Sequence, residues 1–155
     1  MPASGFREQT ITYPMTNYMN NPKPLVLVVE NNEDSRQMLK TLLEIWGYRV
    51  AESEDGEESI ESAVSECPNL ILMDVSLSKM DGLTTVRRMR EIDTLRGVPI
   101  VFISGHAQPE FRTFALTVGG DDFLVKPVDF NQLETVLERY INKNTVNINS
   151  GGITV

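Results

Sequence analysis

Short apolar runs alternate along the chain with longer stretches in which apolar residues recur every three or four positions. The short runs have the length and composition of β-strands, and we predict strands at residues 25–29, 48–51, 70–73, 100–104 and 123–125. The first, third and fourth runs are almost wholly apolar. Such runs are expected of parallel strands that are buried on both faces.

A helical pattern follows each predicted strand, and its apolar positions predict the face that each helix buries. These faces are Met38, Leu42, Ile45 and Trp46; Ile60, Ala63, Val64 and Cys67; Leu83, Val86 and Met89; Phe111, Phe114, Ala115 and Val118; and Phe130, Leu133, Val136, Leu137, Tyr140 and Ile141. Gly47 and Pro68 mark the ends of the first two helices. Five strands alternating with five helices predict an α/β fold, a doubly wound five-stranded parallel sheet with right-handed crossovers.

Length and polarity divide the chain into one domain and two extensions. With 155 residues, 41% of them apolar, the chain is long enough for a single domain with a real core. Residues 1–22 and 144–155 are polar and show no clear period, so we predict flexible extensions around a folded domain at 23–143. Because the chain starts with methionine and only a short tail follows the domain, we expect a complete, stand-alone protein.

Charge and cysteine content narrow the classes of function. The 22 acidic and 14 basic residues give a net charge of −8, which argues against a nucleic-acid surface. The single cysteine, Cys67, cannot form an internal disulfide; a reducing compartment and a half-buried position near a helix end are expected. No apolar run approaches the roughly 20 residues of a membrane helix. The first 22 residues lack a signal-peptide pattern, so we expect a cytoplasmic protein without membrane contact.

Polar side chains stand where four of the predicted strands end. In a doubly wound sheet, the functional crevice lies at the carboxyl ends of the strands. The residues at these ends are Glu30 and Asn31, Asp74, Ser104, and Lys126. Each alone could be an ordinary loop or helix-capping group. Four of the five strand ends carry such groups, and together they predict a site.

The types of residue at these ends indicate phosphoryl chemistry with a metal. Clustered carboxylates are unfavourable unless a cation lies among them, and Mg²⁺ needs only one or two carboxylates because it keeps several waters. With a lysine and a hydroxyl nearby, an aspartate in such a cluster could accept a phosphoryl group. A nucleotide- or flavin-binding enzyme is the alternative on this fold class. It would need a glycine- or hydroxyl-rich phosphate loop, and "ENNEDSR" has no glycine and no net positive charge.

Four segments resemble those of the receiver domains of two-component response regulators, over roughly residues 24–142. "VVENNEDSR" resembles the acidic-pair segment and "LILMDVSLSKMDGL" the phosphoacceptor segment. "VFISGHA" resembles the hydroxyl segment and "DDFLVKPVD" the lysine segment. The resemblance implies a flavodoxin-like (βα)5 fold with the strand order 2-1-3-4-5.

The resemblance also implies a role for each candidate residue. Asp74 would be the phosphoacceptor, with Ser104 and Lys126 binding phosphoryl oxygens. The implied Mg²⁺ ligands are Glu30, Asn31, Asp74 and the backbone carbonyl of Ser76. Ser104 and Phe123 would form the switch, while Ser76 and His106 would tune the lifetime of the phosphoaspartate. We interpret His106 as a loop residue near the site rather than a phosphohistidine, because no kinase motif is present.

The implied function is a signalling switch and not an enzyme, beyond Mg²⁺-dependent self-phosphorylation and self-dephosphorylation. A histidine kinase or histidine phosphotransfer protein would donate the phosphoryl group, a downstream protein would read the switch, and the domain would be a monomer or weak homodimer. The chain departs from the family at Asn31, usually an aspartate, at Ser78, usually a proline, and at Phe123, which lacks a tyrosine hydroxyl. Asn31 supports the alternative of a degenerate receiver that binds partners without phosphorylation.

Overall fold

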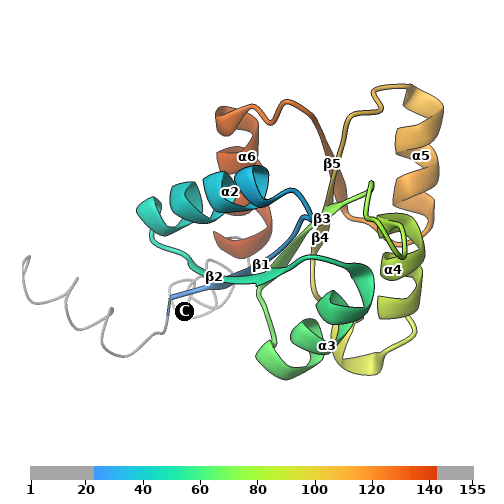
Figure 1. Cartoon of the computed structure of the whole chain (residues 1–155), viewed down its shortest axis with the longest axis horizontal. Helices are drawn as coiled ribbons and strands as arrows, with labels where there is room; N and C mark the ends of the chain where they lie inside the picture. Colours follow the sequence, from blue (N-terminus) through green and yellow to red (C-terminus); the bar gives the residue numbers. More distant parts are fainter. Residues whose placement is uncertain (1–22, 143–155) are drawn as a thin grey trace, which may run out of the picture.

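The apolar runs of the sequence become the central strands of a parallel sheet (Figure 1). The computed structural model describes residues 23–142. Strands β1 (Leu25–Val29), β3 (Leu70–Asp74) and β4 (Ile100–Ser104) are buried along their whole length. Strands β2 (Arg49–Ser53) and β5 (Asp122–Val125) form the two edges, and the order is β2-β1-β3-β4-β5. All neighbours pair in parallel, which confirms the predicted fold and strand order.

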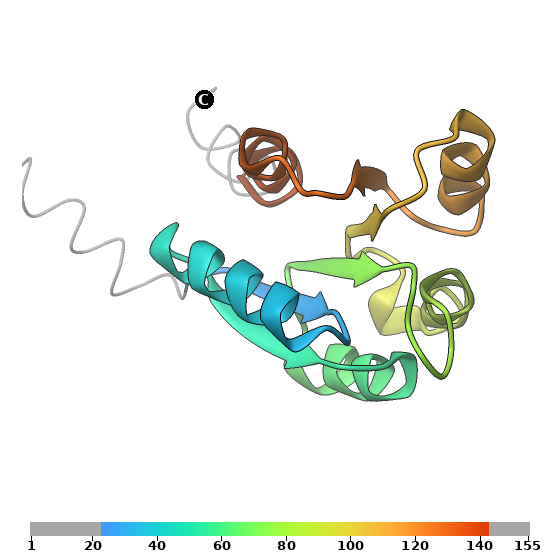
Figure 2. The same cartoon turned by 45° about the horizontal axis from the view of Figure 1, so that its top comes forward.

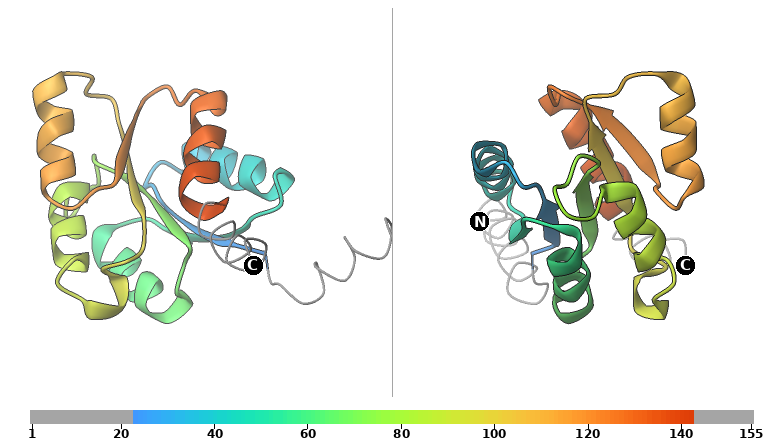
Figure 3. Two further views of the ribbon diagram at one scale, coloured as in Figure 1. Left: turned by 180° about the vertical axis from the view of Figure 1, so that it is seen from behind. Right: turned by 45° about the vertical axis from the view of Figure 1, so that its right-hand side comes forward.

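Helices cover both faces of this sheet (Figures 1 and 2). Helices α2 (Glu33–Ile45) and α6 (Phe130–Leu137) pack on one face, seen together from behind in Figure 3. Helices α3 (Gly56–Glu66), α4 (Gly82–Met89) and α5 (Pro109–Thr117) pack on the other. A short 3-10 helix, η1 (Asp93–Leu95), precedes β4, and a π-helical turn, η2 (Glu138–Asn142), continues α6. The apolar core therefore lies in two layers, one on each side of the sheet.

Side-chain caps begin four of the helices close to the carboxyl ends of the strands. Asn32, Asp55, Asp81 and Asp129 each accept a hydrogen bond from the backbone N–H three residues later. Such caps satisfy N–H groups that a helix leaves unpaired at its start. Four of the loops at this edge of the sheet are therefore fixed where they enter a helix.

Several predicted helix faces are wrong at their margins. In α2 the buried residues are Leu39 and Leu43, whereas Met38 and Ile45 are 45% and 74% exposed. The buried face of α2 is thus shifted by about one residue from the predicted face. Tertiary packing decides which side of α2 faces the sheet. Four other predicted face residues are also exposed, and they are Val64, Cys67, Phe114 and Phe130.

Cys67 differs most from its predicted half-buried position. It caps the end of α3 with a left-handed backbone (φ 53°), and this turn exposes its side chain. Some strands also begin or end at other residues than predicted. Backbone pairing, and not side-chain polarity, decides where a strand ends. Asp74 pairs with Ile103 and so belongs to β3, and Asp122 pairs with Val101 and so opens β5.

The predictions for residues 1–22 and 143–155 lie outside the described part of the chain. Within residues 23–142, no helix has the length and apolar character that crossing a membrane requires.

Candidate functional site

Parallel pairing brings the predicted site residues to a single edge of the sheet. Glu30 follows β1, Asp74 and Ser104 end β3 and β4, and Lys126 follows β5. Three of these residues are in direct contact. The Nζ atom of Lys126 lies 3.1 Å from Oε1 of Glu30 and 3.2 Å from Oδ2 of Asp74. Residues 96 and 52 positions apart in the sequence thus form one cluster.

The two carboxyl groups of this cluster are buried. Glu30 and Asp74 are each 3% exposed, whereas the side chain of Lys126 is 35% exposed. Burying a carboxylate is costly unless a cation or hydrogen-bond donors compensate. One ammonium group between two carboxylates leaves a surplus negative charge when all three are ionised. The cluster therefore favours a further cation or a proton.

The pKa directions agree with this excess of negative charge. Burial raises the pKa of Glu30 above its ordinary value of 4.5, and the hydrogen bond with Asp74 and the negative charge of Asp74 raise it further. Hydrogen bonds from the Asn32 backbone and from Lys126 lower it, but by less. For Lys126, burial acts to lower the pKa, yet the hydrogen bond with Glu30 and the charge of Asp74 outweigh it and raise the pKa. Lys126 therefore keeps its proton.

Backbone groups fix both carboxylates in place. Oε2 of Glu30 accepts a hydrogen bond from the backbone N–H of Asn32 at 3.2 Å, and Oδ1 of Asp74 accepts one from that of Ser76 at 2.9 Å. The guanidinium of Arg36 donates to the carbonyl oxygen of Glu30 at 2.8 Å. It also pairs with acids that follow or lie in β2. Arg36 thus ties the loop after β1 to the neighbouring strand.

Arg36 and Asn32 were not predicted as site residues. One sequence feature could have indicated Arg36: it is a basic residue in the first two turns of a helix that follows an acidic loop. Its inward position depends on β2 packing beside β1, which no local pattern reveals.

The oxygen donors of the predicted metal site suit Mg²⁺. Glu30 and Asp74 supply carboxylates, and the remaining predicted donors are the amide of Asn31 and the carbonyl of Ser76, both in exposed loop residues. Hard oxygen ligands of this kind fit an ion that also keeps waters. Among residues 23–142 no three His, Cys, Asp or Glu side chains group as a metal site.

The predicted switch residues are joined through an aromatic chain. Ser104 is fully buried, and its Oγ accepts a hydrogen bond from the backbone N–H of His106 at 3.0 Å. The rings of His106 and Phe111 lie 5.0 Å apart, and those of Phe111 and Phe123 lie 6.1 Å apart. Phe123 also packs 6.5 Å from Phe102. Phe111 was predicted only as a core residue, yet it connects the loop after β4 to β5.

Comparison with known proteins identifies the family to which the chain is similar. The sequence model of the response regulator receiver domain family matches residues 26–138. The chain is 31% identical over 114 residues to the transcriptional regulatory protein ZraR of Escherichia coli, a match that covers 74% of this chain but only 25% of ZraR. It is 32% identical over 115 residues to an uncharacterised 14.6 kDa protein of Leptolyngbya boryana, covering 74% of this chain and 88% of that protein.

Solved structures share the fold. The receiver domain of the sensor histidine kinase PA1611 from Pseudomonas aeruginosa aligns with a TM-score of 0.72 and 32% identity, over 77% of this chain and 98% of that one. That structure has a magnesium ion coordinated in its active-site cleft. The chemotaxis protein CheY4 of Vibrio cholerae aligns with a TM-score of 0.72 and 29% identity, over 76% of this chain and 98% of that one.

Proposed function

The chain belongs to the response regulator receiver domain family, and we propose that it is a phosphorylation switch that accepts a phosphoryl group on Asp74. The observation that carries this proposal is the contact of Lys126 with two buried carboxylates, one of them at the end of β3. On this proposal the chain is a signalling domain and not an enzyme acting on a separate substrate.

The transfer forms a bond between phosphorus and a carboxylate oxygen of Asp74 and breaks the bond between phosphorus and a histidine nitrogen of the donor. Lys126 already contacts Asp74, so its ammonium is placed to pair with a phosphoryl oxygen added there. The hydroxyl of Ser104 would bind another phosphoryl oxygen. Mg²⁺, held by Glu30, Asn31, Asp74 and the carbonyl of Ser76, would neutralise charge on the phosphoryl oxygens.

The output runs through Ser104 and Phe123. A phosphoryl group on Asp74 would draw the Ser104 hydroxyl toward it, and the aromatic chain from His106 to Phe123 would carry that change to β5 and α5. A downstream protein would then bind this surface differently. The donor would be a histidine kinase or histidine phosphotransfer protein in the cytoplasm.

The test is intact mass after incubation with acetyl phosphate, with and without Mg²⁺. We expect a Mg²⁺-dependent gain of one phosphoryl group that is absent in Asp74→Asn. Retained phosphorylation in Asp74→Asn, with the variant folded by circular dichroism, would refute the assignment of the phosphoacceptor.

A degenerate receiver is the second candidate, and Asn31 is the observation that favours it. Such a module would keep the fold and bind partners without phosphate. It predicts negligible Mg²⁺ binding in a calorimetric titration and no mass gain from either acetyl phosphate or a phosphorylated histidine phosphotransfer protein.

A further inference from the structure

Met80 joins the loop that follows Asp74 to two helices. Its sulfur lies against Gly56, the first residue of α3, at 3.3 Å from the position that a Cβ atom on Gly56 would take. Nη1 of Arg88, in α4, donates to the same sulfur at 3.8 Å. Helices α3 and α4 lie side by side on one face of the sheet (Figure 1), and the Met80 side chain contacts both. The roles proposed above for the site residues do not use Met80.

The Met80 side chain is within reach of small molecules. Of the four methionines in residues 23–142, Met73 and Met89 are fully buried, Met80 is partly exposed and Met38 is 45% exposed. A thioether that reagents can reach is oxidised to a sulfoxide, which is polar and chiral. Peroxides should therefore oxidise Met80 and Met38 before Met73 and Met89.

Arg88 distinguishes Met80 from Met38. A thioether sulfur is a weak acceptor, so its present contact with the guanidinium stabilises little. A sulfoxide oxygen is a stronger acceptor, and hydrogen bonds from a charged donor are about twice as strong as neutral ones. Arg88 also pairs with Glu57 at 3.0 Å, and its five N–H donors allow it to keep that pair. A sulfoxide at Met80 would thus have a donor already in place.

We propose that Met80 is a site of reversible oxidation by peroxides, and that its sulfoxide weakens the metal site and slows phosphorylation. The consequence for phosphorylation rests on the proposed function. In the reaction, the O–O bond of the peroxide breaks and one oxygen atom bonds to the sulfur. The sulfur is oxidised by two electrons, and the peroxide is reduced to water or an alcohol. Methionine sulfoxide reductases reverse the change.

The packing around Met80 decides where the added oxygen atom goes. A Cβ atom on Gly56 would overlap the hydroxyl oxygen of Thr85 and lie 3.2 Å from Cβ of Met80, so the α3 side is crowded. The oxygen atom therefore turns toward Arg88. Its hydrogen bond to the guanidinium replaces the apolar contact with Gly56 and draws the loop away from α3.

Movement of the loop would reach the metal site. The loop has Ser78 where the family usually has a proline, so no ring restrains its backbone. Ser76 lies in the same loop; its carbonyl is an implied Mg²⁺ ligand, and its N–H donates to Asp74 at 2.9 Å. We expect Mg²⁺ affinity to fall about tenfold, in line with the loss of other supporting contacts around metal ligands. Phosphorylation that depends on Mg²⁺ would slow with it.

The test treats the full chain with dilute hydrogen peroxide. Peptide mass mapping should find one added oxygen atom at Met80 and at Met38 before any at Met89. Amide hydrogen exchange of residues 75–80 should become faster, with or without Mg²⁺. Mg²⁺ affinity in a calorimetric titration should fall about tenfold, and the acetyl phosphate reaction should slow by a similar factor. A methionine sulfoxide reductase should restore all three properties.

Two pairs of variants identify the sulfur and its donor. Met80→Leu keeps most of the apolar volume and removes the sulfur, so peroxide should leave its loop exchange and Mg²⁺ affinity unchanged. Met38→Leu should respond to peroxide as the native chain does. Arg88→Gln should lose most of the response, whereas Arg87→Gln should keep it. Arg87 carries the same charge on the same helix but is not the donor to the sulfur.

Met80 oxidised no faster than Met89 would overturn the proposal, as would equal responses to peroxide in Met80→Leu and Met38→Leu. Equal responses in Arg88→Gln and Arg87→Gln would also overturn it, because the loop movement is attributed to Arg88. Faster loop exchange that requires Met80, in a chain that no donor phosphorylates, would support the oxidation site and refute the phosphorylation switch. Phosphorylation that oxidation of Met80 leaves unchanged would support the switch and refute the proposal.

Discussion

Glu30, Asp74 and Lys126 show at the scale of single residues why the site favours a cation. Burial and the neighbouring Asp74 raise the pKa of Glu30, so the folded chain binds that proton more tightly than the unfolded chain does. The resulting stabilisation is complete below the ordinary value of 4.5 and is lost as the pH rises through the folded-state pKa. At neutral pH, ionised Glu30 therefore costs stability, and the metal would remove that cost.

Replacing Glu30 by glutamine should stabilise the protein at neutral pH without divalent cations. The uncharged amide removes the repulsion with Asp74, and we expect the free energy of unfolding to rise by about 1 kcal/mol. The gain should shrink as the pH falls toward 4.5, because Glu30 in the folded chain takes up its proton above that value. Urea denaturation at several pH values measures this, with Glu61→Gln on the exposed side of α3 as the charge control. A Glu30→Gln variant less stable at neutral pH would contradict the account.

Asn31 sets the strength of the proposed metal site. Asn31→Asp adds a carboxylate beside the two buried ones and should raise Mg²⁺ affinity about fivefold or more, since a nearby charge is worth at least about 1 kcal/mol. Calorimetric titration measures the affinity. Asn32→Asp adds the same charge one residue away, where aspartate still caps α2. Equal gains in both variants would mean that position 31 does not ligate the ion.

Arg36 acts on the site through the backbone of Glu30. We expect Arg36→Met to bind Mg²⁺ roughly tenfold more weakly than Lys40→Met, in line with the loss of other supporting contacts around metal ligands. Lys40 is the matched control, because it pairs with the same Glu52 but is not among the donors to Glu30. Equal affinities in the two variants would show that only the charge of Arg36 matters.

At the scale of elements, the close approach of α4 to the end of β3 shapes the loop that follows Asp74. A Cβ atom on Gly82, the first residue of α4, would overlap the backbone oxygen of Asp74. Gly82→Ala should therefore push α4 away, cost about 1–3 kcal/mol of stability and slow phosphorylation. Chemical denaturation and the acetyl phosphate reaction measure both effects. Gly97→Ala has open space around its Cβ and serves as control; similar effects in both would contradict this role.

The same elements show what the sequence could predict. Uninterrupted apolar runs marked β1, β3 and β4 because both faces of those strands are buried, and parallel pairing then placed Glu30, Asp74 and Lys126 together. The buried stripe of α2 was predicted one residue away from Leu39 and Leu43, since the direction of packing is a tertiary property. The roles of Arg36 and Phe111 depend on contacts between different elements of the folded chain, which no local pattern contains.

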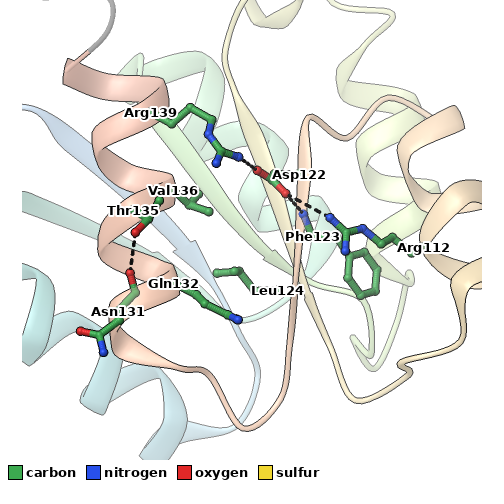
Figure 4. Close-up of a pocket in the computed structure, with 9 residues that line it drawn as sticks. All are labelled: Arg112, Asp122, Phe123, Leu124, Asn131, Gln132, Thr135, Val136 and Arg139. Atoms are coloured by element: carbon green, nitrogen blue, oxygen red, sulfur yellow. Dashed lines mark hydrogen bonds and ion pairs between the residues drawn. The ribbon is translucent and has the colours of Figure 1, made fainter.

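At the scale of the whole molecule, the sheet separates two regions of opposite charge. At the carboxyl ends of β1 and β3, one ammonium faces two carboxylates, while at the β5 edge the two guanidiniums of Arg112 and Arg139 face the single carboxylate of Asp122 (Figure 4). The aromatic chain between them crosses from the loop after β4 to β5. On the proposed function, a phosphoryl group on Asp74 would therefore change binding at the β5 edge without unfolding the domain.

The most direct test of the central claim locates the phosphoryl group. The chain is incubated with acetyl phosphate and Mg²⁺, reduced with sodium borohydride, and digested for peptide mass mapping. Borohydride converts an aspartyl phosphate to homoserine and leaves free carboxylates unchanged. We predict homoserine at position 74 alone, dependent on Mg²⁺. Modification at another residue, or none at position 74 with a phosphorylated histidine phosphotransfer donor as well, would contradict the account.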